Sequence, residues 1–133
     1  MDEKELQEKI IRLESLKESL EQLTVAFTTL QSTYTKTLSF FNNLDKFESP
    51  DGLVSIFPGC FASAKIDSSK FLFQIGDNVY EEVNKTQLKE LLAKRLSEMN
   101  EQLNIVGEQI NRTQEEAAKL EEELARDVQV LKG

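Results

Sequence analysis

The first part of the chain repeats apolar residues every seven positions, in two series that lie three residues apart. Together the two series contain twelve positions: Leu6, Lys9, Leu13, Leu16, Leu20, Leu23, Phe27, Leu30, Tyr34, Thr37, Phe41 and Leu44. All of them except Lys9 and Thr37 are apolar or aromatic, which makes ten of twelve. A heptad pattern sustained over six repeats is typical of a coiled coil. No Gly or Pro interrupts residues 1–49, so the pattern predicts one long helix.

The last part of the chain carries a second heptad pattern of the same length. Its twelve positions are Leu92, Leu96, Met99, Leu103, Val106, Ile110, Thr113, Ala117, Leu120, Leu124, Asp127 and Leu131. All except Thr113 and Asp127 are apolar, which is again ten of twelve. Asn84, followed three residues later by Gln87, is typical of a capped helix start. Gly107 is the one helix breaker inside this stretch and costs about 1 kcal/mol relative to Ala. We call the positions of both patterns the seam, because they should form the contact between the two helices.

The residues between the two patterns favour β structure. Turn-forming residues recur at 49–52, 58–59, 67–69 and 76–78. Between them lie four short runs of strand-like composition, Leu53–Phe57, Cys60–Ile66, Phe71–Ile75 and Val79–Val83. In the third run Phe71, Phe73 and Ile75 alternate onto one face. These runs predict four strands, paired as two hairpins.

The expected architecture is a mainly α member of the α+β class: a long antiparallel two-helix coiled coil with two β-hairpins at its turn end. One domain should cover residues 1–133, with the first helix in 1–47, the β segment in 48–84 and the second helix in 85–133. Because the β segment would return the chain, residues near 1–16 should lie beside residues near 120–133.

The β segment should also join the chain to other subunits. Seven of the eight Phe residues fall between Phe40 and Phe73, which is more aromatic surface than small hairpins can cover, and hairpins expose unpaired strand edges. The residues that we expect at such an interface are Leu53, Ile56, Phe57, Phe61, Phe71, Phe73, Ile75, Val79 and Tyr80. The alternative is a monomer in which the hairpins only cap the coil.

Charge and composition exclude several classes of function. The net charge is −8 with no dense basic patch, which argues against nucleic acid as a partner. The absence of His excludes His-based acid–base catalysis, and a single cysteine, Cys60, excludes an internal disulfide and a zinc thiol tetrad. We therefore expect no enzyme, no metal and no cofactor. Cys60 lies in an apolar stretch, which predicts a small buried residue rather than a reactive thiol.

The N-terminal sequence also bears on location. Residues 1–6, MDEKEL, lack the cationic start and apolar run of a signal peptide, and no stretch has the roughly 18 apolar residues of a membrane helix. We expect a soluble cytoplasmic protein that does not bind membranes.

The order of helix, two hairpins and helix resembles the prefoldin family, and two hairpins instead of one mark its α-class subunit. The run Leu53–Phe61 is similar to the family's first hairpin, residues 65–76 to its linker and third strand, and residues 78–82 to the strand that leads into the second helix. Pro58 departs from the family's more usual non-proline turn residue. The resemblance implies a chaperone hexamer of two α-class and four β-class subunits. Its coiled coils would hold unfolded or nascent proteins at their tips and pass them to a group II chaperonin without ATP.

Under this resemblance the client-binding tip comprises residues from both ends of the chain. Ile10, Ile11, Val128 and Val130 are apolar but lie off the seam, where a two-stranded coil has no need of them. The full set that we expect to contact clients is Leu6, Ile10, Ile11, Leu13, Leu124, Val128, Val130 and Leu131. Val25 and Ile105 are also off the seam, but they lie in mid-coil.

Two other functions stay open at this stage. If the β edges do not close into a hexamer, the same subunit plan can propagate into a structural filament. The coiled coil could also act as an adaptor for one folded partner. An enzyme is the weakest alternative, because no His, Gly-rich phosphate loop or metal-ligand set accompanies the carboxylates.

Overall fold

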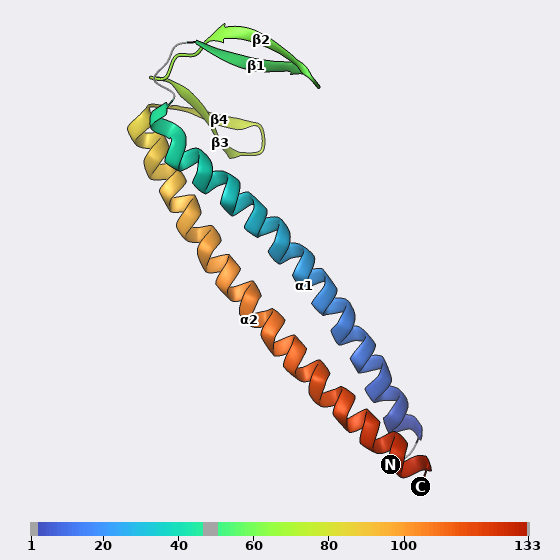
Figure 1. Cartoon of the computed structure of the whole chain (residues 1–133). Coiled ribbons are helices and arrows are strands. Elements are labelled where there is room, and N and C mark those ends of the chain that lie inside the picture. Colours follow the sequence, from blue (N-terminus) through green and yellow to red (C-terminus); the bar gives the residue numbers. More distant parts are fainter. Residues whose placement is uncertain (1–2, 47–50, 133) are drawn as a thin grey trace. The chain divides into compact units, whose positions relative to one another are not determined.

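Two long helices with two small β-hairpins between them make up the fold (Figure 1). The structure is a computed structural model that describes residues 3–46 and 51–132. In chain order the elements are α1 (Glu3–Asn43), the 3-10 helix η1 (Leu44–Lys46), β1 (Asp51–Phe57), β2 (Cys60–Lys65), β3 (Phe71–Gly76), β4 (Val79–Val83) and α2 (Lys85–Lys132). The mainly α fold with two hairpins, expected from the sequence, is therefore confirmed.

The chain divides into two compact units. One comprises residues 1–33 and 99–133, and we call its described part the terminal coil. The other comprises residues 34–98 and is called the central unit. Both helices contribute to both units.

In the terminal coil the seam is the contact between the helices. Among the described residues of α1 up to Thr33, the eight seam positions from Leu6 to Leu30 are the only ones that are not exposed. On α2 the seam residues from Met99 to Asp127 are likewise half-buried or buried. Lys9 reaches Asp127 and Lys17 reaches Glu121, so the two helices run in opposite directions here (Figure 1). Phe27 lies next to Gly107, and because glycine has no side chain, α2 leaves room there for the Phe27 ring.

The central unit has a small core that joins both helices to the second hairpin. Its buried residues are Leu44, Val83, Leu88 and Leu92, with Phe41, Phe71, Phe73 and Leu91 packed against them. Leu44 is fully buried and comes from η1, directly after α1 ends. The first helix thus ends a few residues before residue 47, the bound that the sequence predicts, and Leu44 of η1 packs into this core instead.

The start of α2 is held by two sets of polar contacts. Asn84 Oδ1 accepts a hydrogen bond from Gln87 N at 2.8 Å, and Gln87 Oε1 accepts one from Asn84 N at 2.9 Å. This reciprocal pair is the capping box that the sequence predicts. In addition, Asp45 of η1 accepts from Lys89 at 2.8 Å and forms an ion pair with Lys85 at 3.2 Å. These contacts fasten the end of η1 to the first turns of α2.

The first hairpin pairs β1 with β2 in antiparallel register. Phe57 lies opposite Cys60 across the turn at Pro58 and Gly59, and Gly59 has φ 80°. Proline followed by a residue with positive φ suits a type II turn, so Pro58 is compatible with a hairpin. The expected turn at 49–52 is only partly testable, since residues 49 and 50 lie outside the described residues. Asp51 and Gly52 already belong to β1, so the turn assigned to them is wrong.

The second hairpin pairs β3 with β4, and an irregularity lies near its turn. The register shifts between Gln74 and Gly76, so Ile75 has no direct partner on β4. Phe71 and Phe73 are half-buried, whereas Ile75 is exposed. The expected alternation of all three residues onto one buried face therefore fails at Ile75, because a bulge redirects the side chains that follow it.

Candidate functional site

Apolar side chains that the seam does not use gather at one end of the terminal coil. Ile11 on α1 and Val130 on α2 are 65% and 75% exposed, and Ile10 and Val128 are exposed at 42% and 39%. Leu131, a seam position, is also exposed because the seam ends there. The other expected contact residues, Leu6, Leu13 and Leu124, are half-buried between the helices. This end of the coil thus presents apolar surface from both helices.

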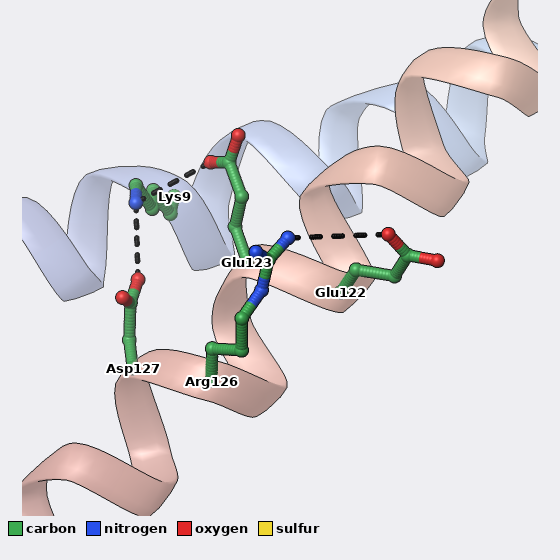
Figure 2. Close-up of polar contacts among 5 residues, drawn as sticks. All are labelled: Lys9, Glu122, Glu123, Arg126 and Asp127. Atoms are coloured by element: carbon green, nitrogen blue, oxygen red, sulfur yellow. Dashed lines mark hydrogen bonds and ion pairs between the residues drawn. The ribbon is translucent and has the colours of Figure 1, made fainter.

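An ion-pair cluster joins α1 and α2 beside the exposed apolar residues of each helix. Lys9 Nζ lies 3.0 Å from Asp127 Oδ2 and 3.4 Å from Glu123 Oε2 (Figure 2). Ile10 follows Lys9 directly, and Val128 follows Asp127 directly, so the two apolar pairs share one end of the coil. The hydrogen bond to Asp127 raises the pKa of Lys9 above its ordinary value, with a further contribution from Glu123.

Exposure alone does not single out this end. Val25 and Ile105 in mid-coil are 62% and 49% exposed, which is comparable. What distinguishes the terminal residues is that four of them come from two helices joined by one ion-pair cluster.

The first hairpin presents apolar side chains on both faces. Leu53 and Phe61, on one face, are 70% and 61% exposed, and Val54 and Ile56 are exposed as well. Phe57 beside the turn is exposed too. Residues 52–64 contain no charged side chain. A two-stranded sheet that exposes large apolar side chains on both faces and carries no charge is typical of a segment that other chains cover.

The second hairpin is fastened to the protein's own helix. The guanidinium of Arg95 on α2 lies 4.2 Å from the centroid of the Phe73 ring and donates a hydrogen bond to the carbonyl of Gln74 at 2.7 Å. Phe71 and Phe73, expected at a subunit interface, pack against the core of the central unit. The outer residues Ile75, Val79 and Tyr80 are exposed. The two hairpins therefore differ, since within the described residues the second packs on the core of the central unit and the first does not.

Three residues of these surfaces were not found from the sequence. Val54 and Leu72 are exposed apolar residues on the hairpins. The sequence does indicate them, since apolar residues occur at alternating and at intervening positions of these strands, and so on both faces. Arg95 gave no such signal, because its partners lie more than twenty positions away in sequence. The expectation that Cys60 is buried is wrong for this chain: Cys60 follows directly on the first turn, and its thiol is free and exposed.

Metal binding and membrane insertion find no support in the part of the chain that the structure describes. Residues 3–46 and 51–132 contain no group of three or more His, Cys, Asp or Glu side chains that could hold a metal ion. No helix within these ranges is long and apolar enough to cross a membrane. The features that stand out are surfaces suited to binding.

Comparison with known proteins agrees with this fold. The family model described as "Prefoldin subunit" matches residues 13–130. Among solved structures, the chain is similar to one titled "Cryo-EM structure of filamentous PFD from Methanocaldococcus jannaschii", with a TM-score of 0.50 and 16% identity, over 90% of this chain and 95% of that one. No sequence among the curated proteins matches significantly. Since the family model spans most of the sequence, the chain belongs to the prefoldin family.

Proposed function

We propose that this chain is a non-enzymatic subunit of an ATP-independent holdase chaperone. Its terminal coil captures unfolded or nascent polypeptides, and its hairpins join it to sister subunits. The observation that carries the proposal is the exposed apolar cluster of Ile10, Ile11, Val128 and Val130, which the coil does not need for its own packing. In a prefoldin-family chain, apolar surface that two joined helices leave exposed is suited to binding unfolded segments.

The assembly that we propose is a hetero-oligomer in which the chain acts as the α-class subunit. Two hairpins between the helices support this class, and the apolar first hairpin supports a partner that covers it. We propose β-class prefoldin subunits as those partners, two α-class with four β-class chains in a hexamer. A group II chaperonin would receive the client, and the setting would be the cytoplasm. All of residues 1–133 would then act as one domain.

The test removes apolar area from the end of the terminal coil. A variant with Ile10, Ile11, Val128 and Val130 all changed to Ser should still assemble, because the hairpins are untouched. Its ability to suppress aggregation of a chemically denatured test protein, measured by light scattering, should fall several-fold. Several coils on one assembly act together, so each weak contact that is lost is multiplied by avidity.

The matched control changes Val25 and Ile105 to Ser. These residues have similar exposure and also lie off the seam, but they are not part of the terminal cluster. The control should protect the test protein almost as well as the parent does. Equal protection by the terminal variant and the parent would place client binding elsewhere.

A structural filament is the second candidate, supported by the similarity to the filamentous PFD from Methanocaldococcus jannaschii. In that case the apolar first hairpin would join copies of this chain without closing a ring. Native mass measurement separates the two candidates. A closed hexamer has one mass, whereas a filament gives a distribution of masses that grows with protein concentration.

A further inference from the structure

The acidity of the chain is concentrated in one of its two units. Residues 1–33 and 99–133 carry fifteen acidic and eight basic side chains, a net charge of −7, whereas residues 34–98 carry nine and eight, a net charge of −1. This asymmetry is hidden in the sequence, because the two acidic segments lie at opposite ends of the chain. The fold brings them together in the terminal coil.

Half of the basic residues of the terminal coil are already occupied by its own carboxylates. Lys9 binds Asp127 and Glu123, and Arg126 lies 4.0 Å from Glu122 in the same region (Figure 2). Lys17 and Arg112 pair with Glu121 and Glu108. A ligand that approaches this unit therefore meets a field dominated by the remaining carboxylates.

Two such carboxylates flank the exposed apolar residues directly. Glu8 and Glu14 lie three residues before and after Ile11, and both are exposed. Neither forms an ion pair with any residue in the described ranges. Residues three apart on a helix have Cβ atoms about 5–6 Å apart, which is shorter than the ~8 Å screening length at physiological salt. Their charge therefore acts on whatever contacts Ile11.

We propose that the terminal coil selects unfolded segments in which apolar residues are flanked by Lys or Arg. This inference rests on the proposed function and names the class of client that the site takes. The apolar cluster holds the apolar residues of the segment, and Glu8 and Glu14, with the surrounding negative field, bind its cationic flanks. Segments flanked by Asp or Glu are repelled, and so are nucleic acids and anionic membranes.

The test uses three unstructured peptides that share one apolar core and differ only in flanking Lys, Gln or Glu residues. Binding to the intact, assembled protein is followed by fluorescence anisotropy at low and high salt. At low salt the Lys-flanked peptide should bind at least about tenfold more tightly than the Glu-flanked one. At ~1 M salt, where the screening length falls to about 3 Å, this preference should shrink to about twofold or less.

A variant with Glu8→Gln and Glu14→Gln locates the effect. It should reduce the preference for Lys flanks about threefold and leave binding of the Gln-flanked peptide within about twofold of the parent. The matched control is Glu90→Gln with Glu98→Gln, exposed glutamates of α2 in the central unit, which changes the net charge equally and should leave the preference intact.

The outcomes separate this inference from the function on which it rests. If the three peptides bind equally at low salt, the charge selection is overturned while the holdase function stands. A preference that both glutamate variants reduce alike would overturn the placement at Glu8 and Glu14. If none of the peptides binds and the protein fails to suppress aggregation, the proposed function fails together with the inference.

Discussion

Lys9 and Asp127 bind each other across the terminal coil, with 3.0 Å between Lys9 Nζ and Asp127 Oδ2. They are the only charged residues at any seam position of the two helices. Each is tolerated among apolar side chains because the other faces it. A shifted alignment of the helices would leave both charges against apolar partners. The pair therefore favours one alignment of α1 and α2.

Reversing one charge of this pair should destabilise the coil. Lys9→Glu places a carboxylate beside Asp127 and Glu123, so the thermal midpoint followed by circular dichroism should fall, most strongly at low salt. Adding Asp127→Lys should restore part of the loss, because opposite charges then face each other again. A double variant no more stable than the Lys9 variant would show that the pair does not set the alignment.

Gly107→Ala should stabilise the protein. A Cβ at this position would lie 3.8 Å from Phe27 Cε2, which is ordinary van der Waals contact, so the ring need not move. Alanine is favoured over glycine inside a helix by about 1 kcal/mol, and denaturant unfolding should show a gain of that order. The contrasting variant is Gly59→Ala, which should lower stability, because Gly59 has φ +80° and a side chain there is strained. A loss of stability in the Gly107 variant would mean that the helices pack more tightly than this contact indicates.

The long-range periodicity of the sequence predicts the helices and their contact faces well. Heptad positions such as Leu13 and Leu120 are half-buried or buried as expected, because residues at this spacing lie on one face of a long helix. The four strand-like runs are also confirmed, with bounds shifted by one or two residues at some ends.

Local irregularities and distant contacts were not predictable in the same way. The bulge that turns Ile75 outward depends on hydrogen-bond register, which composition does not encode. The stacking of Arg95 on Phe73 and the binding of Asp45 by two lysines depend on the fold bringing separate segments together. For the candidate site, the sequence identified the apolar residues at each end of the chain. The charge that surrounds them was apparent only after the fold joined the two ends.

Acid should weaken the joint between η1 and α2. Hydrogen bonds from Lys89 and then Lys85 hold the pKa of Asp45 below its ordinary value of 3.8. Because the folded state binds this proton less readily than the unfolded state, Asp45 contributes stability above about pH 4 and loses it as the pH falls through its folded pKa. Asp45→Asn should therefore lower the thermal midpoint at pH 6 and show a smaller further loss on going to pH 3 than the parent.

The control is a variant that also loses one Asp carboxylate but keeps the contacts between η1 and α2. Asp77→Asn serves this purpose, since Asp77 is exposed in the turn between β3 and β4 and forms no ion pair within the described residues. Its pH profile should follow that of the parent. If the Asp45 and Asp77 variants lose stability in parallel between pH 6 and pH 3, the contacts to Lys85 and Lys89 do not contribute to acid sensitivity.

The difference between the two hairpins leads to opposite expectations for their aromatic residues. Phe73 is stacked under Arg95 and packs on the core, so Phe73→Ser should unfold part of the central unit, with a cost of roughly 1.5–3 kcal/mol from lost burial. Circular dichroism of the isolated chain should report this loss, whether or not the chain assembles.

Substitution of Leu53 and Phe61 should have the opposite effect, because these residues share one exposed face of the first hairpin and do not belong to the core formed by the described residues. Leu53→Ser with Phe61→Ser removes apolar area that is already in water in the isolated chain, so its thermal midpoint should change little. In the assembly the same side chains would be covered by a sister subunit, and their loss should shift the complex toward small species in native mass measurement. Ser63→Ala, on the same face and opposite Leu53, is the control that keeps the face apolar and should leave assembly unchanged. An unchanged mass for the double variant would mean that subunits meet through another surface, and the exposed residues of the second hairpin, Val79 and Tyr80, would be the next to change.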